Sequence, residues 1–152
     1  MKVLYLYSEL MGYQIPILKE YSSKYGAEVH VIHWNHKKLT PFLPSAISNV
    51  FYYKRSGFNN RELIQFVSVI NPDITYISGW MDKGYLKAAR QLIKKGLQVI
   101  SGFDDIWHNT LRQRIASLLF PAVRDRYFSH AWVAGPYQYE FAKRLGFKNQ
   151  QI

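Results

Sequence analysis

The sequence predicts a single α/β domain over residues 1–152, with a doubly wound, mostly parallel, Rossmann-like sheet and helices on both of its faces. Two observations support this prediction. Short apolar runs alternate along the chain with longer segments of helical period, which is typical of repeated βα units. The chain is also 48% hydrophobic, which is enough apolar material for one well-formed core.

Six apolar runs are expected to form the strands. The first begins at Val3 and ends at Tyr7, which is too short for the apolar core of a signal peptide, and a polar loop follows it at once. We place the strands at 2–7, 28–34, 48–54, 73–78, 97–101 and 130–134. Sheets of this kind bind ligands in the crevice beyond the carboxyl ends of the strands, so the loops after the strands are expected to hold the functional residues.

Five helices are predicted between and after these strands, from apolar positions that recur every three or four residues. One face of the first helix is formed by Ile17, Leu18, Tyr21 and Tyr25. The buried stripe of the second is formed by Leu63, Ile64, Val67 and Ile70. The inward side of the third is formed by Tyr85, Ala88, Ala89, Leu92 and Ile93.

Start and stop residues agree with these helices. Asn59 or Asn60 is expected to cap the second helix, Asp82 the third and Thr110 the fourth. Pro136 suits the first turn of the fifth helix, because its missing N–H would have no partner there. The expected helix ends are at Gly26, Asn71-Pro72, Gly96 and Gly146.

Composition narrows the compartment and the partners. The absence of cysteine excludes a disulfide scaffold and a thiolate metal site, and it fits a cytoplasmic protein. A formal net charge of +10 predicts attraction to an anion, such as a phosphorylated substrate, an acidic lipid surface or nucleic acid. No apolar run reaches the roughly 18 to 20 residues that span a bilayer. We therefore expect a cytoplasmic protein, with peripheral attachment to the inner face of the cytoplasmic membrane as an open possibility.

Several common sites are absent from the sequence. It has no GxGxxG after the first strand and no GxxxxGK[ST], which disfavours a dinucleotide-dependent dehydrogenase and a P-loop enzyme. His30, His33 and His36 follow a regular spacing on a strand that runs into a loop, so we do not expect them to converge on a metal ion. An RNA-binding sheet of the RRM type needs aromatic residues on adjacent antiparallel strands, which the βα alternation disfavours. No nucleic-acid partner is expected.

Asp104 and Asp105 follow the fifth strand directly. One interpretation is a turn or helix-capping role ahead of Thr110. The other is that one carboxylate projects into the crevice, where it accepts hydrogen bonds from substrate hydroxyls or acts as a base. The sequence leaves both interpretations open.

The segment from 111 to 126 combines apolar and basic residues. Its arginines are Arg112, Arg114, Arg124 and Arg126. Its large apolar residues are Leu111, Ile115, Leu118, Leu119, Phe120 and Val123. The commoner explanation is a helix that faces the core and keeps its basic side in water. The alternative is a helix that lies in a membrane interface, with the four arginines in contact with acidic lipid.

Three segments resemble the N-terminal half of the GT-B-fold glycosyltransferases, most closely the bacterial family-4 type. They are Asn71-Pro72-Asp73-Ile74 at the start of a strand, the stretch from Val99 to Trp107, and Ala131-Trp132-Val133-Ala134-Gly135 followed by a helix and Leu145-Gly146-Phe147. The family has similar segments in this order, and the resemblance covers essentially the whole chain. The chain departs from many relatives at Asp104, where they have histidine, and in its first loop, where Gly12 stands alone in place of a glycine pair.

The resemblance implies transfer of a sugar from a nucleotide-sugar donor to a glycan or lipid-linked acceptor, in polysaccharide or glycoconjugate biosynthesis, without a metal ion or cofactor. In this fold a C-terminal domain of the same protein holds the donor, so the 152 residues alone are expected to be inactive. The implied catalytic residues are Asp104 and Asp105. The implied substrate-binding residues are Glu9, Gly12, Trp80, Asp82, Trp107 and His108.

Two alternatives remain at this stage. The first is a non-enzymatic domain that binds an anionic polymer or a membrane surface through its basic side chains. The second is a stand-alone flavodoxin-like enzyme or regulator. The second is weaker, because its phosphoacceptor pocket needs a cluster of carboxylates after the first strand, and Glu9 is alone there.

Overall fold

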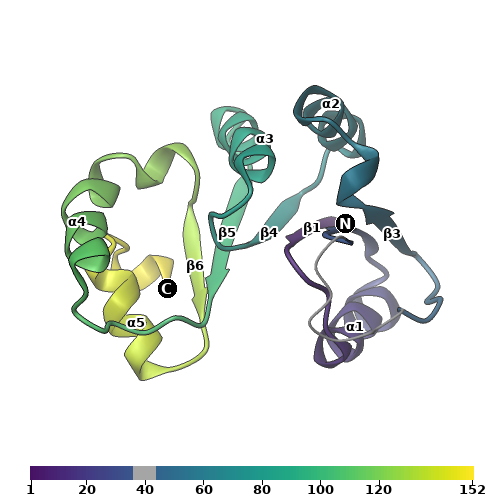
Figure 1. Cartoon of the computed structure of the whole chain (residues 1–152). Helices are drawn as coiled ribbons and strands as arrows, with labels where there is room; N and C mark the ends of the chain where they lie inside the picture. The colour runs from purple at the N-terminus through teal and green to yellow at the C-terminus, as the bar shows by residue number, and fades with distance from the viewer. Residues whose placement is uncertain (36–43) are drawn as a thin grey trace.

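The computed structural model describes residues 1–35 and 44–152 and contains a six-stranded sheet in the order β3-β2-β1-β4-β5-β6 (Figure 1). Every neighbouring pair in this sheet is parallel. The strands are β1 Lys2–Tyr7, β2 Glu28–His33, β3 Val50–Lys54, β4 Ile74–Ser78, β5 Gln98–Phe103 and β6 His130–Val133. The predicted doubly wound, Rossmann-like α/β fold is confirmed.

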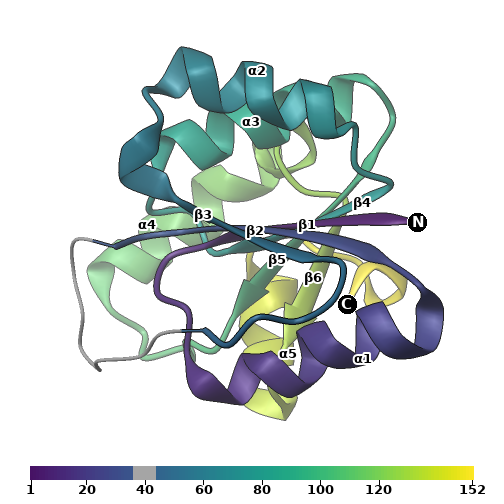
Figure 2. The same cartoon turned by 90° about the vertical axis from the view of Figure 1, so that its right-hand side faces the viewer.

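The helices form a layer on each side of the sheet. They are α1 Ile15–Tyr25, α2 Asn60–Ile70, α3 Lys83–Lys94, α4 Leu111–Leu119 and α5 Pro136–Arg144. Figure 2 shows α2 and α3 on one face of the sheet and α1 and α5 on the other. In Figure 1, α4 lies beyond β6, at that edge of the sheet. None of the helices in the described part of the chain is long and apolar enough to cross a membrane.

Alternate side chains of the strands enter two separate cores, because successive residues of a strand point to opposite faces. On the α2 and α3 face, Leu4, Leu6 and Ile77 are fully buried and pack with residues of both helices. On the other face, Val29 and Val31 pack against Leu18 of α1. The predicted inward stripes of α2 and α3 are largely confirmed, since Leu63, Val67, Ile70, Tyr85, Ala88, Ala89 and Leu92 are buried.

The caps predicted for three helices are confirmed. The side chain of Asn59 accepts hydrogen bonds from the second and third N–H groups of α2, and Glu62 completes the capping box. Asp82 caps α3 and Thr110 caps α4 in the same way. Gly26 follows α1 in the left-handed conformation, with φ of 57°, which glycine adopts without steric cost.

The predicted face of α1 is only partly right. Leu18 is buried, but the side chains of Ile17 and Tyr25 are 40% and 59% exposed. The reason is that α1 packs on β2 and β3 near one side of the sheet. A narrow stripe of the helix is therefore covered, and Ile17 instead lines a cavity.

The core-facing interpretation of α4 is wrong. Leu111, Leu118 and Leu119 are 74%, 78% and 60% exposed, while the buried residue of this helix is Gln113. The Gln113 amide donates to the carbonyl oxygen of Ile106 and accepts from the N–H of His108, both at 2.7 Å. Gln113 ties the preceding loop to the inward side of α4, and this orientation leaves the leucines on the outside.

The predicted membrane contact of Arg124 is also wrong. Arg124 is only 4% exposed, in the irregular turns that follow α4. Its guanidinium lies 4.8 Å from the ring centre of Phe147, donates to Gln151 Oε1 at 2.7 Å and is paired with Asp125. This arginine therefore joins the turns to the C-terminal segment. The other three arginines of the segment, Arg112, Arg114 and Arg126, are exposed.

Candidate functional site

A cavity of about 1070 Å³ opens at the carboxyl ends of β1, β4 and β5 and continues along the sheet face between α1 and α5. Its polar end is lined from the loops that follow these strands. The lining residues there include Ser8, Glu9, Ser78, Trp80, Asp104, Asp105, His108 and Arg112. The cavity lies where parallel α/β sheets bind their ligands.

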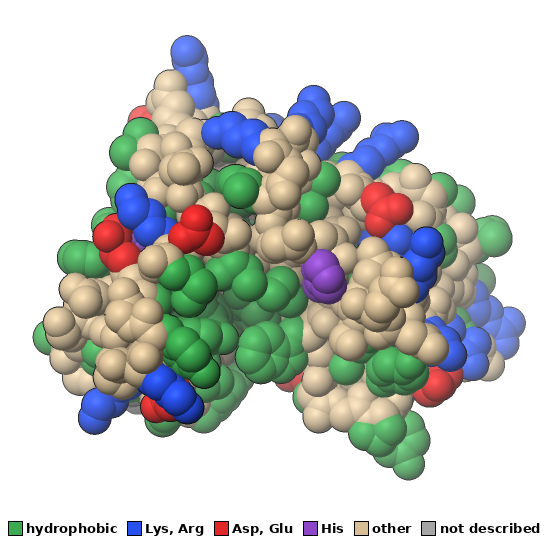
Figure 3. All heavy atoms as spheres, turned by 180° about the vertical axis from the view of Figure 1, so that it is seen from behind, with side chains coloured by type: hydrophobic (Ala, Val, Ile, Leu, Met, Phe, Trp, Pro, Cys, Tyr) green, Lys and Arg blue, Asp and Glu red, His purple; other side chains and the backbone are tan. Residues whose placement is uncertain are grey.

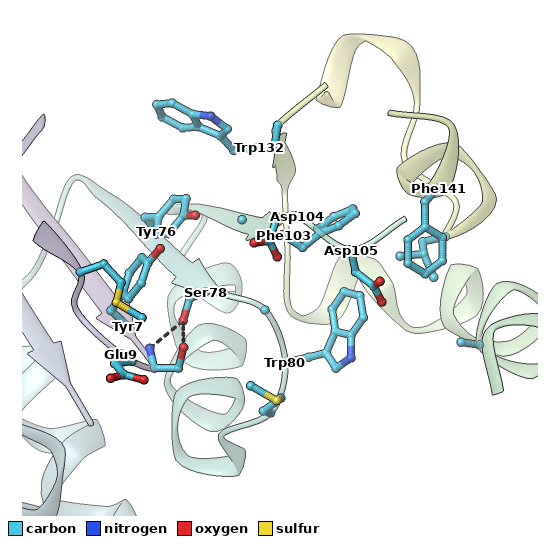
Figure 4. Close-up of a pocket in the computed structure, with 18 of the residues that line it drawn as sticks. Tyr7, Glu9, Tyr76, Ser78, Trp80, Phe103, Asp104, Asp105, Trp132 and Phe141 are labelled. Atoms are coloured by element: carbon cyan, nitrogen blue, oxygen red, sulfur yellow. Dashed lines mark hydrogen bonds between the residues drawn. The ribbon is translucent and has the colours of Figure 1, made fainter. Parts of the chain in front are cut away.

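Hydrogen bonds between strands fix the base of this polar end. The N–H of Ser8, directly after β1, donates to Ser78 Oγ at 2.7 Å, and Ser78 Oγ donates to Ser8 Oγ at 3.2 Å. Figure 4 shows this pair beside Glu9. Because Ser78 is the last residue of β4, the two bonds hold the loop that contains Glu9 against the end of the neighbouring strand.

The two aspartates after β5 have different surroundings. Asp105 accepts a hydrogen bond from the N–H of Ile106 at 2.9 Å, and its carboxylate lies 3.8 Å from His108 Nε2. The carboxylate of Asp104 is directed towards the part of the cavity that contains Tyr76 (Figure 4). Burial raises the pKa of Tyr76 to about 12, and the nearby carboxylate of Asp104 contributes in the same direction. Asp105 therefore forms the turn, and Asp104 faces the crevice.

Trp80 forms part of the cavity wall. It stands in the loop between β4 and α3, where Gly79 has a φ of 73° that favours glycine. The Trp80 ring packs against the rings of Phe103 and Phe120, at centre-to-centre distances of 5.8 and 5.5 Å. These contacts hold the indole in place while part of its surface faces the cavity.

The structure brings together five of the eight residues that the sequence proposed for the site: Glu9, Trp80, Asp104, Asp105 and His108. The other three, Gly12, Asp82 and Trp107, are not among the described residues that line the cavity. Gly12 begins a single 3₁₀ turn before α1. Trp107 packs against Phe141 at 5.8 Å, and the guanidinium of Arg144 lies 4.8 Å from its ring centre.

Asp82 is bound by donors of the protein itself. Its carboxylate accepts from Trp34 Nε1 at 2.9 Å and from Arg55 Nε at 3.0 Å, and it accepts from the N–H groups of Gly84 and Tyr85. Burial opposes ionisation of this carboxyl, but the hydrogen bonds from Arg55 and Trp34 outweigh that effect and lower its pKa. Asp82 therefore anchors the loop that contains Trp80, at the start of α3.

Aromatic residues on the sheet face were missed as site residues. Tyr5, Tyr7, Tyr76 and Trp132 line the cavity, and none of them was predicted as a site residue. Tyr76 lies across β5, where a side chain at Gly102 would collide with its phenol ring. Tyr5 and Tyr7 are two residues apart on β1, so the sequence alone predicts that both lie on one face of this strand.

In the described part of the chain, no group of three or more His, Asp or Glu side chains is arranged to hold a metal ion. His30 is instead hydrogen-bonded to Glu28 and Tyr53, at 2.7 and 3.1 Å. His36, the last residue of the histidine series, lies outside the described residues.

No family model and no curated protein matches the sequence. Among solved structures, the chain is similar to the Bordetella bronchiseptica enzyme WbmH, determined in complex with NAD⁺, with 13% sequence identity and a TM-score of 0.45. The match covers 67% of this chain and 39% of WbmH. The chain thus spans well under half of the length of that enzyme.

Proposed function

We propose that this chain is the acceptor-side domain of a GT-B-type glycosyltransferase, which transfers a sugar from a nucleotide-sugar donor to a glycan or lipid-linked acceptor. The observation that best supports the proposal is the gathering of Glu9, Asp104, Asp105 and Trp80 around one cavity at the strand ends. Carboxylates accept hydrogen bonds from sugar hydroxyls, and an indole offers a flat apolar surface to a sugar ring.

In the proposed reaction, an acceptor hydroxyl oxygen attacks the anomeric carbon of the donor sugar. The bond from this carbon to the diphosphate oxygen breaks, and the diphosphate leaves with the electron pair. The hydroxyl proton passes to a carboxylate, for which Asp104 is the best placed because it faces the crevice. Sugar transfer is a substitution without net oxidation or reduction, so we propose that the reaction uses no redox cofactor.

The donor would be held by a second, C-terminal domain of the same protein, as in other GT-B enzymes. Helix N-termini and basic side chains can neutralise a leaving diphosphate, and we propose a reaction that needs no metal ion. On this chain, His108 lines the polar end of the cavity and would face the donor.

The test is transfer activity of the native polypeptide isolated from its source cells, with a panel of radiolabelled nucleotide sugars and with oligosaccharides and lipid extracts as acceptors. We expect labelled product from at least one donor, and no product from residues 1–152 alone. A Glu20→Gln variant of the native polypeptide should transfer sugar as fast as the wild type, because this exposed carboxylate lies in α1 outside the cavity. The absence of transfer from every donor would contradict the proposal.

We also propose that α4 attaches the protein to an acidic membrane surface, in the cytoplasm. Its exposed apolar residues, Leu111, Ile115, Leu118 and Leu119, follow the i, i+4, i+7, i+8 spacing and form one stripe. Arg112 and Arg114 are exposed on the same helix, and Arg126 is exposed in the turns that follow it. A helix with this combination binds by inserting its apolar side chains while its cations meet acidic headgroups.

Flotation with liposomes tests this attachment. We expect recovery with vesicles of phosphatidylcholine and phosphatidylglycerol at low salt, and little recovery with phosphatidylcholine alone, because each arginine near an acidic surface contributes about 1 kcal/mol. Leu118→Ser is expected to weaken binding about tenfold, since it removes most of one inserted side chain. Val69→Ser is the control, because Val69 is 80% exposed on α2. Equal recovery with both kinds of vesicle would rule out an electrostatic anchor.

A further inference from the structure

The cavity has a second half with a different chemistry. From the polar end it continues along the sheet face that α1 and α5 flank. We call this part the aromatic groove; it is formed by Tyr5, Tyr7, Tyr76 and Trp132 on the strands and Ile17 on α1. Figure 3 shows hydrophobic side chains gathered around a hollow in the lower half of the molecule, between the parts that contain α1 and α5. Trp132 is 50% exposed there.

The tyrosines of the aromatic groove line it together with the apolar side chain of Ile17. The rings of Tyr5 and Tyr76 have centres 5.0 Å apart. The rings of Tyr7 and Tyr76 are stacked, with centres 5.9 Å apart and planes 11° from parallel. Burial raises the pKa of both phenols, so they are neutral at physiological pH.

Gln14 also contributes a polar side chain to the wall of the cavity, beside the aromatic groove. It is 5% exposed, and its Oε1 accepts from the N–H of Met11 at 2.8 Å. The carboxylates Glu9, Asp104 and Asp105 stand at the other end, beyond the strand ends. A single continuous cavity therefore has a charged end and an apolar end.

On the basis of the proposed transferase function, we propose that the acceptor is amphipathic, with a polar head among these carboxylates and an apolar tail in the aromatic groove. A glycan is polar along its whole length, and its hydroxyls would lose water in a groove whose walls are mainly aromatic rings and the side chain of Ile17. An apolar tail loses no hydrogen bonds to water there, and it covers the exposed ring of Trp132 and the half-buried ring of Tyr76. The volume of about 1070 Å³ exceeds what a single sugar fills.

Binding of alkyl β-D-glucosides to the 152-residue chain tests the inference, measured by titration calorimetry below the micelle concentration of each compound. We expect affinity to rise about fourfold for each added methylene from hexyl to decyl, as burial of an apolar chain predicts. Trp132→Ala and Ile17→Ser should each flatten this dependence. Both side chains are substantially exposed, so the variants are expected to fold. Val69→Ser, on the opposite helix layer, should leave the dependence unchanged.

Malto-oligosaccharides form the second arm of the experiment. Affinity that grows with the number of glucose units and ignores the alkyl chain would overturn the inference in favour of a glycan acceptor. If Val69→Ser and Trp132→Ala flatten the chain-length dependence equally, the glucosides adsorb to the protein surface in general. This result would also overturn the inference. Chain-length dependence without sugar transfer by the native polypeptide would contradict the transferase proposal while the tail-binding groove stands. Transfer to free oligosaccharides without chain-length dependence would contradict the groove alone.

Discussion

Asp104→Asn is expected to lower kcat/KM for sugar transfer by the native polypeptide at least about 10²-fold. The substitution keeps the size of the side chain and the bond from Gln138 Nε2 to the Asp104 backbone oxygen, but it removes the acceptor for the hydroxyl proton. The loss should fall on kcat more than on KM, because the proton moves in the transition state. Initial rates at saturating donor, measured across pH, provide the readout.

Asp105→Asn is the matched comparison. Asparagine can accept the same bond from the N–H of Ile106, so the turn should persist and kcat/KM should change less than about tenfold. If kcat/KM is unchanged in Asp104→Asn but falls in Asp105→Asn, then Asp105 and not Asp104 accepts the proton. Full activity of both variants would contradict the assignment of the site to this loop.

Asp82→Ala is expected to lower the free energy of unfolding by about 3 kcal/mol or more, the cost of removing one partner from a buried ion pair. The side chains of Arg55 and Asp82 are only 14% and 11% exposed, and Arg55 would keep its charge without its partner. Trp34 Nε1 and the first turn of α3 would lose their acceptor as well. Urea unfolding followed by circular dichroism measures the change.

Two controls separate the ion pair from the helix cap. Asp82→Asn keeps a capping oxygen and loses the charge, so it should cost less than Asp82→Ala. Glu62→Ala removes an exposed member of the α2 capping box and is expected to cost about 1 kcal/mol or less. If Asp82→Ala is no more costly than Glu62→Ala, the pair does not hold the Trp80 loop.

The lowered pKa of Asp82 also gives a pH dependence. The stability that its ionised form contributes is fully present above the unfolded pKa of aspartate, about 3.9. It is lost as the pH falls below that value and through the lower folded pKa. Wild type should therefore lose more stability than Asp82→Asn between about pH 4 and pH 2.

Much of the fold follows from local patterns. The six strands, the caps at Asn59, Asp82 and Thr110 and the inward faces of α2 and α3 were all predicted, because each depends on nearby residues. Strand ends were less accurate: the fifth strand extends to Phe103, since Gly102 and Phe103 pair with β6. The face of α4 was mistaken because the contacts of Gln113 with its preceding loop outweigh the pattern of leucines.

The site was predicted in part for a similar reason. The loops after parallel strands meet at one edge, so the sequence placed Glu9, Asp104 and Asp105 in one region, and their roles stay predictions. The aromatic groove was missed because alternation shows which residues share a face but not whether a helix covers that face. Cover here depends on where α1 and α5 pack, which is a property of the whole fold (Figure 2).

The position of β1 in the sheet affects how the chain folds during synthesis. β1 leaves the ribosome before β2 and β4, and it pairs with β2 on one side and with β4 on the other. At about 5–20 residues per second, β4 emerges on the order of seconds after β2. During that interval one edge of β1 has free N–H and C=O groups beside Leu4 and Leu6, which is the kind of open edge that other chains can join. The nascent chain therefore depends on the arrival of β4 to close this edge.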